Sequence, residues 1–404
     1  MSDAVFLEEL HERQRAFDAL EPECEMTIRD PELGVEGHVI VWSTLAVKDG
    51  PLGRVGKGGT RITSTVTKDE ITRLARTQTL KNAAVGLATG GAKSGLRADP
   101  QAEGFERLYR RFVRLAWPCH YDNGGLWGGL GYDLGGDPRH CQWAIDELGT
   151  TRCFTGKPVE QGGTDYDVEG IAGLGVATAA ATWLETSGCN AVGATAAVQG
   201  IGAMGAAVCR YFTQLGGCVT TIADPRIDGA WRLHKPLSGV LLDAIAEMDF
   251  RTTREHLINE GHQQLPIADV LWEETDILFP CAVQDVIDTD NQDRIRAGVV
   301  VEGANNPCTM SARHALHSRG VPVVPDFIAN PGGAIAASVE MTSSVTDEEN
   351  ARTYAKVDEA KHATRTMVAD NVREVVEIAA AHDAPLVDAA SLLALRRIFA
   401  FATR

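Results

Sequence analysis

Positive charge is scarce in this sequence. It has 38 Lys and Arg residues against 55 Asp and Glu residues, a formal net charge of -17 at pH 7. A surface this acidic repels phosphate groups and anionic lipid headgroups, so we expect neither nucleic acid nor a membrane as a partner. Long hydrophobic runs are missing as well. The longest, residues 171–184, has 14 residues of mostly small side chains, whereas a transmembrane helix needs about 20.

Paired cysteines are also missing. The nine cysteines form no Cys-x-x-Cys pair and no metal-ligand spacing with histidine, so we expect no metal site. An odd number of unpaired thiols is typical of a reducing compartment. Residues 1–9 carry three acidic residues and no basic stretch, so we expect no signal peptide and a cytoplasmic protein. The 404 residues, 44% of them hydrophobic, suffice for two domains with full cores.

A glycine-rich stretch at residues 90–95 contains a single lysine, Lys93, and Lys81 and Lys57 precede it. Glycines let the backbone crowd around an ammonium group, which can then hold an anionic substrate or act as a base with a lowered pKa. Residues 67–85 predict a helix that begins with a capping box. Its periodicity places Lys81 at the edge of the buried face, where it either binds a ligand or extends past the rim of the core to water.

A second glycine-rich stretch contains Asp133. Seven glycines lie between residues 124 and 136. Loops of this kind bring the backbone close to ligands, although they also serve as connectors. Asp133 is therefore a candidate functional carboxylate, and the alternative is a residue that stabilises its own turn.

From about residue 155 the pattern changes to short apolar strands alternating with helices. This alternation predicts a doubly wound parallel sheet with functional loops at the carboxyl ends of its strands. The expected strands are residues 194–199, 219–223, 276–279, 298–301 and 321–324.

The strand at residues 194–199 leads into a Gly-x-Gly-x-x-Gly motif that opens a helix. Such glycines allow a tight turn and bring a pyrophosphate against the helix N-terminus. Asp224, 19 residues past the last glycine, would bond ribose hydroxyls and repel a 2′-phosphate, which favours NAD. Arg226 could instead accept that phosphate, so NADP stays open. The predicted cofactor-binding residues here are Gly200, Gly202, Ala203, Met204, Gly205 and Asp224.

At this point the chain resembles the glutamate, leucine, phenylalanine and valine dehydrogenase family. The likeness extends from residue 57 to residue 333, in the family's order. The segments that carry it are Lys57-Gly58-Gly59-Thr60-Arg61, Thr79-Leu80-Lys81-Asn82, Gly90 to Gly95, Gly131-Tyr132-Asp133 with Trp143, Val198 to Gly205, Val301 to Asn305 and Pro325 to Gly333.

The resemblance implies a two-domain α/β enzyme. A substrate-binding and oligomerisation domain would comprise residues 1–155, with helices from 341–404 packing back on it. A Rossmann-type domain that binds NAD(P) would occupy residues 156–340. The implied reaction is the reversible oxidative deamination of an L-amino acid to a 2-oxo acid and ammonia. The implied assembly is a homo-oligomer, a hexamer or an octamer.

The resemblance also implies roles for single residues. Lys81 resembles the lysine that binds the substrate α-carboxylate. Lys93 resembles the catalytic lysine, which activates water when unprotonated. Asp133 resembles the proton shuttle to the substrate amino group. The alternative for Lys93 is a structural ion pair. Gly59 and Asn330 fall within the family's substrate-binding segments.

Two departures from the family pattern concern the ligands. In glutamate dehydrogenases a lysine at the position of Lys57 pairs with the side-chain carboxylate of the substrate, and this chain keeps that lysine. Those enzymes also bind the same carboxylate with a serine hydroxyl, and this chain has Ala337 at that position. A buried lysine without a carboxylate would be costly, so we favour glutamate or another polar or acidic amino acid. The alternative is an apolar pocket of the leucine, valine or phenylalanine type, which the segments at residues 30–34 and 59–61 also resemble. Near the cofactor, Ile171-Ala172-Gly173 replaces Ala-Thr-Gly.

Without that threonine hydroxyl, cofactor orientation would rely on Asn305 and Asn330, or on another donor supplied by an insertion nearby. Two further readings remain: a dehydrogenase of another 2-oxo acid or amine, and a non-catalytic ligand-sensing homologue. Retention of Lys81, Lys93 and Asp133 argues against the sensor, because a non-catalytic relative has no need of this charged group.

Overall fold

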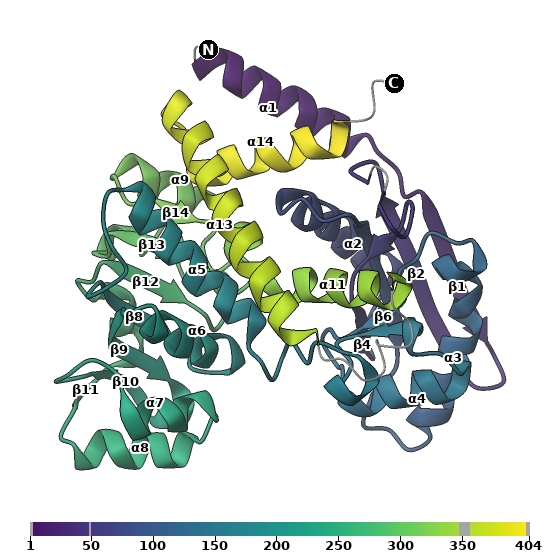
Figure 1. Cartoon of the computed structure of the whole chain (residues 1–404), viewed down its shortest axis with the longest axis horizontal. Helices are drawn as coiled ribbons and strands as arrows, with labels where there is room; N and C mark the ends of the chain where they lie inside the picture. The colour runs from purple at the N-terminus through teal and green to yellow at the C-terminus, as the bar shows by residue number, and fades with distance from the viewer. Residues whose placement is uncertain (1–2, 48–49, 347–355, 401–404) are drawn as a thin grey trace. The chain divides into compact units, whose positions relative to one another are not determined.

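The computed structural model describes residues 3–47, 50–346 and 356–400 (Figure 1). The chain divides into two compact units. The amino-terminal unit comprises Glu8–Tyr166, Ala334–Ala363 and Leu392–Arg404. The central unit comprises Met1–Leu7, Asp167–Gly333 and Thr364–Ser391.

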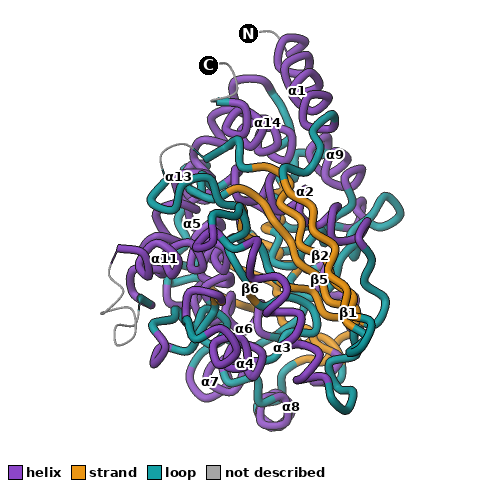
Figure 2. The backbone as a smooth tube through the Cα atoms, turned by 90° about the vertical axis from the view of Figure 1, so that its right-hand side faces the viewer, coloured by secondary structure: helices purple, strands orange, loops and turns teal. Residues whose placement is uncertain are grey.

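The amino-terminal unit is built on a five-stranded sheet with the order β1-β2-β5-β3, in which β4 also pairs with β5 (Figure 2). Strands β1, β2 and β5 are antiparallel, whereas β3 and β4 run parallel to β5. The strands of this unit are β1 (Cys24–Asp30), β2 (Val35–Ser43), β3 (Gly56–Lys57), β4 (Thr60–Thr63), β5 (Gly90–Arg97), β6 (Leu130–Gly131) and β7 (Phe154–Thr155). The helices that lie between them are α2 (Lys68–Ala84), α3 (Phe105–Ala116) and α4 (Pro138–Leu148).

Strand β5 separates the hydrophobic core from the face that carries Lys93. Successive side chains of a strand point to opposite faces, and Ala92 and Leu96 belong to a core cluster completed by α3 and α4. On the other face, a Cβ at Gly91 would overlap the backbone nitrogen of Thr79 in α2. Alternation therefore directs Lys93 toward the side on which α2 packs.

Helix α2 confirms the predicted helix at residues 67–85. Its N-cap is Thr67, whose hydroxyl accepts a hydrogen bond from the Glu70 backbone, and Val85 ends it. The Glu70 carboxylate accepts a hydrogen bond from Arg61 on β4. The side chain predicted to complete the capping box thus links the helix to the sheet.

The central unit is a seven-stranded sheet with the order β11-β10-β9-β8-β12-β13-β14. The five neighbouring strands β9, β8, β12, β13 and β14 are parallel, as predicted. Strands β10 and β11 add an antiparallel edge that the sequence pattern did not indicate. The strands are β8 (Thr195–Gln199), β9 (Cys218–Asp224), β10 (Gly229–Arg232), β11 (Gln263–Leu265), β12 (Ile277–Pro280), β13 (Val299–Val301) and β14 (Val323–Val324). The helices are α5 (Ile171–Thr186), α6 (Ala203–Gln214), α7 (Gly239–Ala246), α8 (Phe250–Asn259), α9 (Met310–Ser318) and α10 (Asp326–Ala329).

The compact units divide the chain at Tyr166 and Gly333 rather than at residues 155 and 340, and they assign residues 364–391 to the central unit. The physical reason for that assignment is a close approach: a Cβ at Gly175 on α5 would touch the side chains of Thr364 and Val368. Residues 347–355 and 401–404 of the predicted C-terminal helices lie outside the described residues. Helices that contribute residues to both units are α1 (Asp3–Asp18), α11 (Gly332–Thr346), α13 (Val357–His382) and α14 (Leu386–Phe399).

Within the described residues, no single helix has the length and apolar character to cross a membrane. Helices α13 and α14 meet those criteria only when taken together, and the chain bends by 113° between them.

Candidate active site

The structure brings Lys93 and Asp133, which are 40 residues apart in the sequence, into direct contact. The Lys93 Nζ lies 3.0 Å from Asp133 Oδ1. The second carboxylate oxygen, Oδ2, accepts a hydrogen bond of 2.9 Å from Arg61 Nε. Asp133 follows β6, and Gly59 permits its approach, because a Cβ at Gly59 would overlap the Tyr132 carbonyl oxygen. The result is a carboxylate held between two cations.

Burial and charge oppose each other in this group. Burial lowers the pKa of Lys93 and outweighs the attraction of Asp133, and the positive charges of Arg61 and Lys81 lower it further. For Asp133 burial acts to raise the pKa, but Lys93 and Arg61 together outweigh it and hold the pKa below its ordinary value. A lysine with a lowered pKa and a carboxylate with a lowered pKa are thus in contact, an arrangement suited to proton exchange.

Arg61 is the functional candidate that the sequence interpretation missed. The sequence places it in the segments at residues 57–61 and 59–61, without a role of its own. Its importance comes from the pairing of β4 with β5, which the sequence pattern does not reveal. Arg61 is paired in register with Gly95, which shares a face of β5 with Lys93.

Lys57 is buried in the same unit. Its Nζ donates hydrogen bonds to the Gly129 carbonyl at 3.0 Å and to the Leu130 carbonyl at 2.5 Å. Burial lowers its pKa to about 7, with a smaller opposing effect from the charge of Glu340. In the described part of the chain, its ammonium therefore meets carbonyl oxygens rather than a carboxylate.

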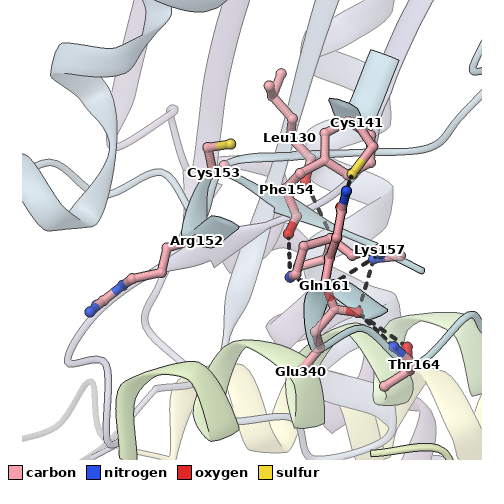
Figure 3. A network of polar contacts seen from close by, with 12 residues as sticks. Leu130, Cys141, Arg152, Cys153, Phe154, Lys157, Gln161, Thr164 and Glu340 are labelled. Atoms are coloured by element: carbon pink, nitrogen blue, oxygen red, sulfur yellow. Dashed lines mark hydrogen bonds and ion pairs between the residues drawn. The ribbon is translucent and has the colours of Figure 1, made fainter. Parts of the chain in front are cut away.

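A third buried lysine, Lys157, has a carboxylate partner (Figure 3). It forms an ion pair with Glu340 on α11 and also donates a hydrogen bond of 2.8 Å to the Phe154 carbonyl. The same carboxylate accepts hydrogen bonds from the Gly156 backbone, the Thr164 backbone and the Thr164 hydroxyl. Lys157 and Glu340 are 2% and 0% exposed, and the network ties residues 154–164 to α11.

Two other predicted substrate residues, Lys81 and Ala337, lie in the amino-terminal unit. Lys81 lies on α2, partly buried, and its charge acts on Lys93. Ala337 is buried on α11, one turn before Glu340. Their roles in binding substrate stay predictions.

In the central unit the glycine motif forms the turn from β8 into α6. Gly200 has a φ of +85°, and a Cβ at Gly205 would overlap the Gly200 carbonyl oxygen. Ala203 and Met204 open the helix, whose first backbone N–H groups lack intrahelical acceptors and attract negative charge. The turn therefore fits the pyrophosphate of a dinucleotide.

Asp224 ends β9 beside this turn. Its Oδ2 accepts a hydrogen bond of 3.1 Å from the Ile201 backbone. Arg226 forms two side-chain hydrogen bonds with the same carboxylate, at 2.7 and 2.8 Å, and stacks over Phe250. The two residues that were expected to decide between NAD and NADP thus neutralise one another.

Asn305 and Asn330 are also brought together. The Asn330 amide donates hydrogen bonds to the Gly303 and Ala304 carbonyls and to Asn305 Oδ1. Just beyond, the buried ion pairs of Arg313 with Glu302 and Asp326 join α9 to the ends of β13 and β14. Through its own hydrogen bonds, Asn330 orders the loop after β13. Its predicted role in binding substrate stays a prediction.

One α/β unit thus has a glycine turn of the type that binds dinucleotides, and the other has a buried lysine in contact with a half-buried aspartate, features typical of a dehydrogenase. Residues 162–403 match the family model for Glutamate/Leucine/Phenylalanine/Valine dehydrogenase, and residues 46–148 match that for the Glu/Leu/Phe/Val dehydrogenase dimerisation domain. The chain belongs to this family, which confirms the resemblance and the two-domain α/β fold. It is an NAD(P)-dependent amino-acid dehydrogenase that catalyses oxidative deamination.

Named relatives cover most of the chain. It is 32% identical over 333 residues to glutamate dehydrogenase A2 of Halobacterium salinarum, covering 79% of this chain and 76% of the relative. It is 33% identical over 309 residues to the NADP(+)-dependent glutamate dehydrogenase of Pyrobaculum calidifontis, covering 73% and 72%. Among solved structures it resembles the hetero-hexameric glutamate dehydrogenase of Thermus thermophilus in its Leu-bound form. There the TM-score is 0.75, with 26% identity and coverage of 98% and 94%.

Proposed function

We propose that the amino acid oxidised is L-glutamate or another amino acid with an acidic side chain. The observation that carries this proposal is the burial of the Lys57 ammonium against two carbonyl oxygens. A substrate carboxylate would supply a negative partner for this buried charge and would raise the Lys57 pKa from about 7. The glutamate dehydrogenases among the relatives support the same substrate.

The proposed chemistry uses three groups of the amino-terminal unit. Lys81 binds the substrate α-carboxylate. Asp133 takes a proton from the substrate amino group at Oδ1, the oxygen that faces Lys93. A bound nicotinamide would accept the hydride that leaves the substrate α-carbon. Lys93, with its lowered pKa, activates the water that hydrolyses the imine to the 2-oxo acid and ammonia.

We propose NAD as the preferred cofactor over NADP. Asp224 presents a carboxylate next to the glycine turn, and its ion pair with Arg226 occupies the guanidinium that a 2′-phosphate would need. Replacing Asp224 by Asn should release Arg226 and raise kcat/KM for NADP relative to NAD by about tenfold. An unchanged ratio would contradict this assignment.

The second candidate is an amino acid with an apolar side chain. The specific observation in its favour is Ala337, a buried methyl group in the segment that carries a serine in the glutamate enzymes the chain resembles. The two candidates differ in what Lys57 should do.

The test compares the wild type with the Lys57→Met variant on a panel of 2-oxo acids with ammonia and NADH or NADPH. We expect the wild type to turn over 2-oxoglutarate. In the Lys57→Met variant the KM for 2-oxoglutarate should rise by about 100-fold, because one buried charge contact with the substrate is lost. Lys68→Met, at an exposed lysine of α2, is the control and should leave KM unchanged. Turnover confined to branched or aromatic 2-oxo acids, with Lys57→Met neutral, would establish the second candidate.

We also propose a homo-oligomer, a hexamer or an octamer, in the cytoplasm. The match of residues 46–148 to a dimerisation domain supports self-association. Light scattering of the purified protein would give its mass as a multiple of the 43.3 kDa chain, and a monomer would contradict the proposal.

A further inference from the structure

The carboxylate of Asp133 is held from two sides, and only one of its two cations has a role in the proposed chemistry. Lys93 contacts Oδ1. Arg61 contacts Oδ2 through Nε, and its NH1 donates a second hydrogen bond of 2.7 Å to Glu70 on α2. Arg61 therefore joins β4, α2 and the loop after β6 through its guanidinium alone.

This arrangement differs from an ordinary surface ion pair. The side chains of Arg61, Asp133 and Glu70 are 22%, 21% and 29% exposed, so solvent screens them only in part. A guanidinium offers donors in a fixed plane. When one edge is bound to Glu70 and Nε to Asp133, rotation of the Asp133 carboxylate would break a charge-assisted hydrogen bond.

We propose that Arg61 is a positioning residue of the reaction. It fixes the Asp133 carboxylate so that Oδ2 stays engaged and Oδ1 alone exchanges protons with the substrate nitrogen. This inference rests on the proposed roles of Lys93 and Asp133.

The surrounding charges determine the direction of the effect. Lys93 on β5 and Arg61 on β4 face Asp133 directly, Glu70 and Lys81 on α2 act through these two, and Lys57 on β3 lies close enough to interact with Lys93. Arg61 lowers the pKa of Asp133 and of Lys93 alike. Removing its charge raises both values, so both groups hold their protons to higher pH.

The experiment measures kcat and KM against pH for oxidation of the best amino-acid substrate. The proteins are the wild type, Arg61→Gln, Arg61→Lys and a control, Arg111→Gln. Arg111 pairs with Asp30 in the same unit at 2.6 Å but is 43% exposed. We expect Arg61→Gln to move the acidic limb of the kcat profile upward by about 1 pH unit and to lower kcat at pH 7 by about 10- to 100-fold, the range associated with a lost proton-transfer contact.

KM should change less than threefold, because the hydrogen bond of Arg61 is to the proton-transfer group and the proposed binding of the substrate carboxylates is by Lys57 and Lys81. Arg61→Lys keeps the charge and should restore the limb to within about 0.3 pH units, with kcat still reduced because a lysine lacks the planar pair of donors. Arg111→Gln should match the wild type. Thermal denaturation of every variant identifies any loss of folding, and the folded Arg61→Lys variant keeps the test decisive.

A double variant separates positioning from simple structural support. If Arg61 acts through Asp133, then Arg61→Gln should lower kcat by less than twofold once Asp133 is Asn. Independent losses in the double variant, or a pH-independent fall in kcat for Arg61→Gln, would overturn the inference. Failure of the wild type to oxidise any amino acid would instead contradict the proposed function, so the two failures are distinguishable.

Discussion

The buried ion pair of Lys157 with Glu340 allows a quantitative prediction of stability. Replacing Lys157 by Met keeps the length of the side chain but leaves the Glu340 carboxylate without its cation at 0% exposure. Removing one partner of a buried pair costs about 3–5 kcal/mol. Glu340 would keep hydrogen bonds from Gly156 and Thr164, so we expect the lower end, a loss of about 3 kcal/mol in the free energy of unfolding.

Replacing Glu340 by Gln should cost a similar amount, because Lys157 then keeps only the Phe154 carbonyl. The double variant, Lys157→Met with Glu340→Gln, leaves neither charge of this pair unpartnered, and the glutamine oxygen can still accept hydrogen bonds from the backbone. We therefore expect the double variant to lose less stability than either single variant.

Urea denaturation followed by tryptophan fluorescence, at one fixed protein concentration, measures these differences. Lys68→Met removes an exposed pair with Glu25 and should cost under about 1 kcal/mol. The reasoning would be refuted if Lys157→Met were as mild as Lys68→Met, or if the two single losses simply added in the double variant.

Three further predictions concern other parts of the amino-terminal unit. Gly91→Ala should unfold this unit or cost more than about 3 kcal/mol, because its Cβ would overlap the backbone of α2; normal thermal stability would contradict the overlap. Glu9 has its pKa lowered to about 2, chiefly by its hydrogen bond with Arg396. A lowered carboxyl pKa stabilises the fold at pH above about 4.5, and the benefit is lost as pH falls toward 2. The free energies of unfolding of the wild type and Glu9→Gln should therefore converge near pH 2 in an acid titration. At pH 6 they should differ by less than about 1 kcal/mol, because the pair is partly exposed. A hydrogen bond with Cys119 lowers the pKa of the half-buried Cys24 thiol, so peptide mapping after brief iodoacetamide treatment at pH 7 should show more labelling of Cys24 than of the exposed Cys189; less labelling of Cys24 would count against it.

The sequence predicted those features that depend on local chemistry. The helix at residues 67–85 and the parallel strands were predictable because capping residues and short apolar runs act within a few residues of each other. The antiparallel strands β10 and β11 were not, since β11 has exposed glutamines and no apolar alternation. Their pairing depends on the neighbouring strand β9.

The site shows the same limit. Lys93 and Asp133 were identified as candidates from their glycine-rich surroundings, and the structure places them in contact. Arg61 was missed, because its importance arises from the parallel pairing of β4 with β5, which residue spacing does not reveal. Lys157 and Glu340 lie 183 residues apart, and nothing in either local sequence indicates the other.

The glycines on either side of Lys93 restrict how this enzyme can change. A Cβ at Gly91 would meet α2, and one at Gly95 would lie 2.5 Å from Ile71. A mutational library that varies one position at a time would therefore find Gly91 closed to any side chain, whereas a side chain at Gly95 would have to displace the end of Ile71. Under the proposed substrate roles, the side chains that would set specificity are those of Lys57 and Ala337, which lie outside this stretch. Laboratory evolution of the enzyme should accumulate its first changes at those two positions and leave residues 91–95 untouched.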